Sequence, residues 1–223
     1  MTGGSPNSVA VDPRPWRNEI AVAVEADPKQ DPGSIEFYKT DGTFIKSVPA
    51  GALPDMVTYG PKGRYVYAAN EGEPDDDYLV DPEGSVTIID VRRGAARVKP
   101  SDVHQVSLAS LIGQEDALRA AGVRIFGPDA NAAQDLEPEY VAVDPRGRKA
   151  FVICQENNAL LEIDVRRKSL TAITALGTKD HSFPGNALDP SNRDSGIEIA
   201  NWPVQGFYMP DAIAAYKYRG KTY

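Results

Sequence analysis

Short apolar runs separated by turn residues recur along the whole chain. One run at 140–143 is followed by the turn Asp144-Pro145-Arg146-Gly147, and two further runs occupy 150–154 and 160–165. Apolar runs of this length, bounded by Pro, Gly, Asn and Asp, are typical of strands joined by hairpins. The pattern therefore predicts an antiparallel meander.

The same order of signals is repeated elsewhere in the chain. Each copy opens with Pro and a small polar or acidic residue, as in Pro6-Asn7, Pro54-Asp55, Pro138-Glu139 and Pro210-Asp211. Successive copies are separated by roughly one propeller blade (about 40–50 residues), or by more where an insertion is present. Further strands are predicted at 19–24, 34–38, 44–48, 65–70, 85–91 and 170–174.

We therefore predict an all-β fold, a β-propeller of four-stranded antiparallel blades. The chain would hold about three blades, at 6–50, 54–100 and 138–176, and the first strand of a fourth from 210. Insertions are predicted at 71–84, 101–135 and 177–208, and the second should contain short helices at 108–112 and 114–122. A closed ring requires at least four blades. Three blades would thus be a fragment of a larger propeller, a truncated product, or one part of an assembly with another chain.

Composition narrows the classes of ligand. The formal net charge is -8, which argues against a nucleic-acid partner and is compatible with cation binding or simply with solubility. Cys154 is the only cysteine, so no intrachain disulfide is possible, and its place in an apolar run predicts a small buried side chain. The chain has no apolar stretch of the ~20 residues that a membrane helix needs, so we expect no membrane insertion. The first residues have neither the basic start nor the apolar core of a signal peptide, and we expect none in this chain.

Several motifs, taken in order, resemble the choice-of-anchor I domain family. They include Ala69-Asn70-Glu71-Gly72-Glu73-Pro74, Gln134-Asp135-Leu136-Glu137-Pro138-Glu139-Tyr140, Gln155-Glu156-Asn157-Asn158-Ala159, Lys179-Asp180-His181-Ser182 and Asn201-Trp202-Pro203. The family is similar to the mesenchyme-specific cell-surface glycoproteins, and some members carry alkaline-phosphatase-like names. The resemblance implies a YVTN/WD40-like β-propeller from a parent protein that is exported to the periplasm or cell surface.

Acidic residues give the first candidate site. The predicted loop at 71–84 is rich in carboxylates, which repel one another unless a hard cation with oxygen ligands, such as Ca²⁺, is bound. The candidate ligands there are Glu71, Glu73, Asp75, Asp77, Asp81 and Glu83. The spacing is not that of an EF-hand, and the alternative is a solvated hairpin tip.

Two other candidate sites lie later in the chain. Gln134, Asp135, Glu137 and Glu139 precede an inner strand, and Gln155, Glu156, Asn157 and Asn158 follow the next one, so these side chains could line a polar channel mouth that binds a cation or a sugar. Their alternative role is turn and cap chemistry. Asp180 and His181 could supply a base or a metal ligand, although neighbours in a loop do not by themselves form a catalytic pair. Trp202 could hold its loop in place or stack on a sugar.

Three functions are compatible with these features. The one we favour is a non-catalytic cell-surface or periplasmic propeller domain that binds a partner protein, a glycan or a divalent cation. The alternatives are a metal-dependent phosphatase or esterase, and a lactonase-like enzyme with an axial divalent cation.

Overall fold

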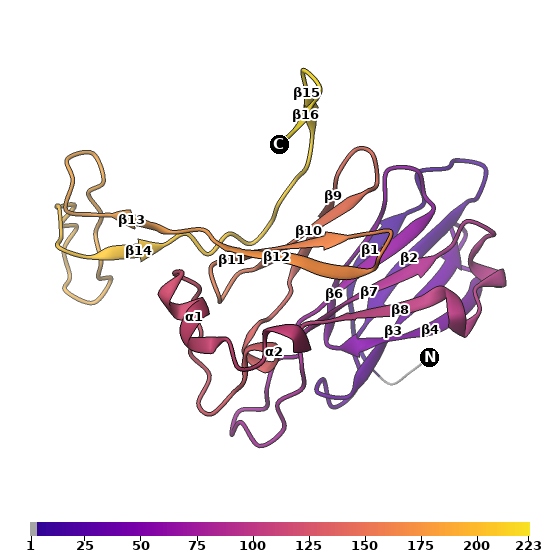
Figure 1. Ribbon diagram of the computed structural model, residues 1–223, viewed down its shortest axis with the longest axis horizontal. Helices are drawn as coiled ribbons and strands as arrows, with labels where there is room; N and C mark the ends of the chain where they lie inside the picture. Colours follow the sequence, from indigo (N-terminus) through magenta and orange to yellow (C-terminus); the bar gives the residue numbers. More distant parts are fainter. Residues whose placement is uncertain (1–3) are drawn as a thin grey trace.

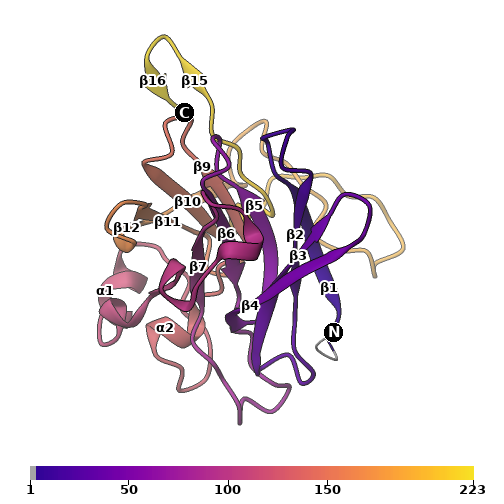
Figure 2. The ribbon, with the colours of Figure 1, turned by 90° about the vertical axis from the view of Figure 1, so that its right-hand side faces the viewer.

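The computed structural model describes residues 4–223, so the first three residues of the segment in which we expect no signal peptide lie outside it. Three four-stranded antiparallel sheets stand side by side (Figures 1 and 2), in the strand orders β1-β2-β3-β4, β5-β6-β7-β8 and β9-β10-β11-β12. Each sheet is a meander whose sequence neighbours pair, as predicted. The all-β fold and the four-stranded antiparallel blades are confirmed.

The strands agree closely with the apolar runs of the sequence. They are β1 Pro6–Val11, β2 Glu19–Val24, β3 Pro32–Lys39, β4 Phe44–Ala52, β5 Pro54–Tyr59, β6 Tyr65–Asn70, β7 Ser85–Asp90, β8 Val103–Ser107, β9 Tyr140–Val143, β10 Lys149–Cys154, β11 Ala159–Asp164 and β12 Ser169–Ala175. The insertions carry short helices, namely η1 Ala95–Arg97, η2 Pro100–Asp102, η3 Ala109–Leu111, α1 Glu115–Ala120 and α2 Ala132–Asp135.

Two features differ from the predicted boundaries. Strand β8 completes the second sheet, although its residues fall in the segment predicted as an insertion. The sequence did not indicate a strand there, because Val103 and Val106 are its only large apolar side chains. The segment after β12 leaves the sheets and carries two small strand pairs, β13 Thr178–Asp180 with β14 Gln205–Phe207 and β15 Lys217–Tyr218 with β16 Lys221–Thr222. In the described structure, residues 211–216 form no strand. Figure 1 shows both pairs extending away from the sheets.

Apolar side chains fill the spaces between neighbouring sheets. Ile35 and Phe37 of the first sheet are fully buried in one cluster with Val66 and Ile89 of the second. Tyr67, Val86 and Ile88 lie on the other face of the second sheet, because successive strand residues point to opposite faces. Their cluster also holds Val152 and Leu161 of the third sheet. The second sheet is thus buried on both faces, as a blade between two neighbours must be.

The outer face of the first sheet is not covered in the same way. Val9 and Val11 point away from the second sheet, and their exposed fractions are 62% and 64%. Such blade-like sheets with an apolar face left open are consistent with a propeller fragment. Among residues 4–223, no helix has the length and apolar character needed to cross a membrane.

The repeated Asp-Pro turns have a local explanation. The Asp144 carboxylate accepts hydrogen bonds from the backbone N–H groups of Arg146, Arg148 and Lys149, and Gly147 takes the positive φ of +69° that closes the turn. Asp12 accepts in the same way from the Arg14 backbone at 2.9 Å. A carboxylate that bonds to the backbone a few residues ahead stabilises a tight turn. These turns close one end of the first and third sheets, and Gly60-Pro61-Lys62-Gly63 takes the same place in the second. The opposite end is formed by the strand entries described next.

Candidate functional site

The candidate site lies at the end of the sheets where the innermost strands begin. Strands β1, β5 and β9 lie side by side and open with equivalent polar residues, Asn7, Asp55 and Glu139. The chain returns to the same place at Asp211. Beyond burial, the charge of Asp211 helps to raise the pKa values of both Asp55 and Glu139, which shows that the three side chains lie near one another. The motif of Pro followed by a polar residue therefore places one polar side chain per copy at the end where β1, β5 and β9 meet, the position of the axis in a propeller.

The residues that follow the second strand of each sheet face these entries. In the first sheet the Asn7 amide donates to the Glu25 carboxylate at 3.2 Å. In the third sheet the Gln155 amide nitrogen, in the orientation that satisfies its neighbours, donates to both Glu139 oxygens at 2.8 and 2.9 Å. The corresponding residues of the second sheet are Asp55 and Glu71, two carboxylates with no amide to bridge them. This sheet therefore contributes repulsion where the other two have a hydrogen bond.

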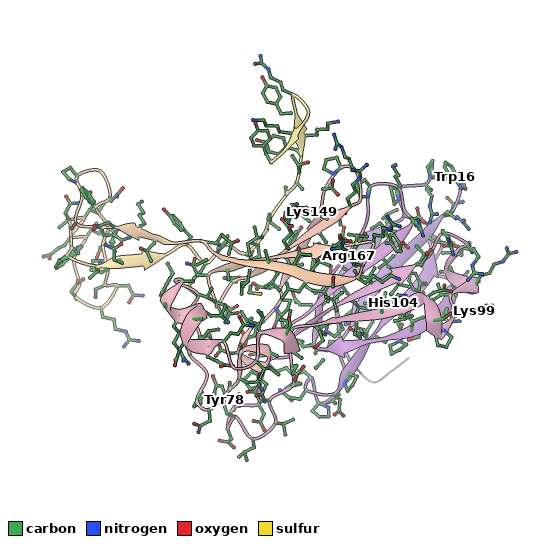
Figure 3. The ribbon with its side chains drawn as sticks, in the orientation of Figure 1. Trp16, Tyr78, Lys99, His104, Lys149 and Arg167 are labelled. Carbon is green, nitrogen blue, oxygen red and sulfur yellow. The ribbon has the colours of Figure 1, made fainter. Side chains whose placement is uncertain are left out.

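A cleft of about 320 Å³ opens beside this cluster. We call it the axial cleft, and its lining comprises Glu71, Glu73, Pro74, Tyr78, Phe126, Glu137, Glu139 and Glu156. Its walls come from the acidic hairpin at 71–84, from the loop that precedes α2, from the segment that enters β9 and from the turn between β10 and β11. Tyr78 marks the hairpin side in Figure 3. Five carboxylates thus share one small concave space with two aromatic rings.

Burial and mutual repulsion raise the pKa values of these carboxyl groups. Burial, and then the charges of Asp55 and Glu139, raise the pKa of Glu71 to about 8. Burial, and then Glu156, raise the pKa of Glu137 to about 8, and the same two causes raise that of Glu139 to about 7. Within residues 4–223 none of these three glutamates forms an ion pair. The cluster is therefore electrostatically unsatisfied and attracts positive charge.

The basic groups near the cleft have other partners. The Lys29 ammonium group lies 2.5 Å from the Glu73 carboxylate at the rim. The Arg124 guanidinium group stacks 3.7 Å above the centre of the Phe126 ring and donates to the Glu156 backbone carbonyl. Neither residue forms an ion pair with Glu71 or Glu137, although the pKa of Lys29 is raised by its hydrogen bond to Glu73 and, to a smaller extent, by the charge of Glu71.

The predicted acidic-loop site is only partly gathered together. Glu71 and Glu73 enter the axial cleft, while Asp77 and Glu83 are exposed. Asp75 shapes the hairpin, because its carboxylate accepts from the backbone of Leu79 at 2.7 Å. Burial, and then the negative charge of Asp135, raise the pKa of Asp81. Within the described chain, no group of three or more His, Cys, Asp or Glu side chains is placed to hold a metal ion directly.

Three amide residues of the second predicted cluster have structural partners. Asn157 is fully buried, and its amide group donates to the backbone oxygens of Arg124 and Asp135 and to the Asp135 carboxylate, and accepts from Glu137. Asn158 donates to the Gly177 carbonyl at 2.7 Å and has the positive φ of +50° expected of a turn asparagine. Gln134 bonds to the Asp81 carbonyl. Asn157 holds the backbone of Glu137 in place, and all three amides have little capacity left for a ligand.

Asp180 and His181 lie on the extended segment that carries β13 and β14, outside the axial cleft. The Asp180 carboxylate accepts from the Ser182 hydroxyl at 2.7 Å, and the His181 Nδ1 atom lies 2.7 Å from the Asn186 carbonyl oxygen. Each side chain thus serves its own loop. The Trp202 indole N–H donates to the Leu188 carbonyl, which pins this loop to itself. Cys154 is fully buried, and burial raises the pKa of its thiol, so it is a core residue as predicted.

Sequence reasoning had not assigned Asp55, Asp211, Tyr78 or Phe126 to the site. Asp55 and Asp211 could have been found, since each follows a Pro at the start of a repeat, in the position that Glu139 occupies. The two aromatic residues could not, because only the folded insertion brings them to the cleft.

Comparisons with known proteins support this architecture. A model of the choice-of-anchor I domain matches residues 1–223. Hydrazine synthase of Kuenenia stuttgartiensis is similar in structure, with 18% identity and a TM-score of 0.51 over 78% of this chain and 50% of that chain. The β-propeller domain of Cps50 (Swd1) from Myceliophteria thermophila shows 11% identity and a TM-score of 0.46, over 76% of this chain and 41% of that chain. The β-propeller domain of the trilobed protease from Pyrococcus furiosus has 7% identity and a TM-score of 0.42, covering 76% of this chain and 42% of that chain.

The similarity to the hydrazine synthase chain, at 18% identity, concerns the fold alone. The chain spans half the length of the hydrazine synthase chain that it matches, and less of the two propeller domains. No curated protein sequence matches the chain.

Proposed function

Because this chain belongs to the choice-of-anchor I domain family, we propose that it is a non-catalytic, surface-associated propeller domain that binds a divalent cation in its axial cleft. One observation carries the proposal. Glu71, Glu137 and Glu139 are held together in a concave space with pKa values raised to about 8, 8 and 7, and no cationic side chain of the described residues pairs with them.

The donor atoms fit a hard cation. The cleft offers carboxylate oxygens, the Gln155 amide lies beside Glu139, and no histidine lines the cleft, which favours Ca²⁺ over Zn²⁺. We propose Glu71, Glu137 and Glu139 as the residues that hold the ion, with Glu73 and Glu156 at the edges. Water molecules would complete its coordination, since no three carboxylates of the described residues are placed to hold an ion directly. The cation would supply the positive charge through which a partner protein or a glycan could bind at this mouth.

The alternative function is hydrolysis. Glu137 lies in the axial cleft with its pKa near neutrality, as a general base requires, whereas Asp180 and His181 each bond within a surface loop. This placement favours a lactonase-like reaction over a phosphatase-like one. Turnover of a lactone that is lost in Glu137→Gln would support the alternative and contradict the non-catalytic proposal.

Calcium titration by isothermal calorimetry tests the proposal. At pH 8 we expect a dissociation constant on the order of 10⁻⁴ to 10⁻³ M, weakened at least ~10-fold in the double variant Glu71→Gln/Glu137→Gln. Binding should tighten as pH rises from 6 to 8, by up to about tenfold per pH unit for each proton that leaves the glutamates. The matched control is Asp76→Asn/Asp77→Asn, which replaces the same number of carboxyl groups by amides at exposed positions of the acidic hairpin. Equal affinities for the two double variants would contradict the axial site.

A further inference from the structure

Positive charge is concentrated at the end of the sheets opposite the axial cleft. The connections within the first, second and third sheets that lie at this end are 12–18, 39–43, 60–64, 90–102, 144–149 and 164–168. They contain fifteen Lys and Arg residues, six Asp and no Glu, whereas the whole chain has 24 Lys and Arg and 32 Asp and Glu. The acidic composition therefore conceals one basic end, which we call the turn end.

Contacts between the turns show that they form one surface. The Arg17 guanidinium group of the first sheet donates to the Arg92 carbonyl of the second at 2.8 Å. The Lys168 ammonium group of the third sheet lies 2.9 Å from the His104 ring of the second. In Figures 1 and 2 the β15–β16 hairpin, with three further basic residues, extends beside the turn that follows β9.

Some of this positive charge is free to meet a ligand. Six of the fifteen basic residues pair with neighbouring carboxylates, namely Arg14, Lys39, Arg64, Arg92, Arg93 and Lys149. Lys62, Arg146 and Arg167 are exposed, and none of them forms an ion pair with a residue of the described chain. Lys62 and Arg146 also line a hollow of about 170 Å³ between the second and third sheets, together with Arg64 and Tyr65. Arg64 pairs with Asp90 at 3.4 Å, so Lys62 and Arg146 are the two unpaired cations beside the hollow, and two such side chains suit a phosphate group.

An apolar side chain projects from the same end. Trp16 follows Arg14 and Pro15 in the first turn, and 74% of its surface is exposed. Figure 3 shows it at the tip of the molecule, on the side of Lys99 and away from Tyr78. An exposed tryptophan among arginines has little to gain from a polyanion in water. At a lipid surface, its ring can enter the headgroup region while the cations meet the phosphates.

We propose that the turn end docks on the surface of an anionic phospholipid bilayer, with Lys62, Arg146 and Arg167 against the headgroup phosphates and Trp16 at the interface. The contact is peripheral, and it leaves the axial cleft at the far end of the strands open to solvent. It does not depend on cation binding in that cleft.

Vesicle co-sedimentation of the purified chain tests the proposal. The chain should bind phosphatidylcholine vesicles with about 30% phosphatidylglycerol at ~0.1 M salt, and release them at ~0.5 M salt. Each basic side chain near such a surface contributes about fivefold to the partition coefficient, so Arg146→Glu/Arg167→Glu should bind at least ~25-fold more weakly. The matched control, Lys179→Glu/Arg193→Glu, makes the same charge change on the exposed β13–β14 segment and should bind within about twofold of the parent.

Fluorescence gives an independent readout. The chain has two tryptophans, so Trp202→Phe leaves Trp16 as the sole reporter, and its emission should shift to shorter wavelength on anionic vesicles. Equal binding to phosphatidylcholine alone, an equal loss in both double variants, or binding to soluble inorganic polyphosphate without binding to vesicles would each overturn the proposal. Circular dichroism confirms that each variant is folded before it is scored.

Discussion

Replacing Asn157 with alanine is expected to lower the free energy of unfolding by about 3–5 kcal/mol. The side chain is fully buried and joins three segments, because it bonds to Arg124, Asp135 and Glu137. Its loss would leave the Asp135 carboxylate and the Glu137 backbone N–H without this partner, and buried polar groups without partners are costly. For a chain of this size we expect the melting temperature to fall by about 10 °C.

Differential scanning calorimetry measures this effect. Asn157→Asp should be comparably damaging, because it brings a second carboxylate against Asp135, 3.0 Å from the present amide nitrogen. Asn192→Ala, on the exposed segment between β13 and β14, serves as the control and should change the melting temperature by less than about 2 °C. A similarly small change in Asn157→Ala would show that this amide does not hold the insertion to the third sheet.

The stability of the chain is expected to fall as pH rises from 5 to 8 in the absence of divalent cations. The native pKa values of Glu71 and Glu137 are about 8, far above the unfolded value of ~4.5, so the native state binds more protons throughout this interval. Stability decreases with pH wherever the native state holds more protons than the unfolded state. Because these side chains are only half-buried and water screens their repulsion, we expect a total loss of about 3 kcal/mol.

Urea unfolding at a series of pH values tests this dependence. Glu71→Gln/Glu137→Gln should flatten the profile and make the variant more stable than the parent at pH 8, since a neutral amide replaces each raised carboxyl group. The exposed pair Asp194→Asn/Glu198→Gln should leave the profile unchanged. Saturating Ca²⁺ should restore the stability of the parent at pH 8 and have little effect on the cleft variant. A parent that gains stability from pH 5 to 8 would contradict the raised pKa values.

The strands could be predicted from the sequence because each is an apolar run with strong turn signals at its ends. The segments 19–24, 65–70 and 140–143 were predicted with the bounds that the structure shows. β8 was missed because three of its five residues are polar and its outer position requires little burial. The helical insertion was anticipated at α1, where Gly122 takes a positive φ of +93°, but not at α2, whose single turn is fixed by the Asn131 cap.

The site was predictable only as far as the repeats placed it. The position after Pro in each copy put Glu139 near the axis, and the adjacent polar runs put Glu137 and Glu156 beside it. Which polar residues face the cleft and which form structural hydrogen bonds depends on tertiary contacts between residues ~20–30 positions apart. A single sequence does not reveal these contacts. Asn157 illustrates this limit, because an asparagine that binds a metal ion and a buried asparagine with a structural role look the same in the sequence.

Basic residues are concentrated at one end of the strands and carboxyl groups at the other, so the charge of the molecule is distributed as a dipole. A negatively charged surface would exert a torque on it before any contact was made, turning the basic tips forward and the carboxylates back. The molecule would then reach the surface in one orientation, with its axial cleft facing the solution and accessible to cations and other ligands.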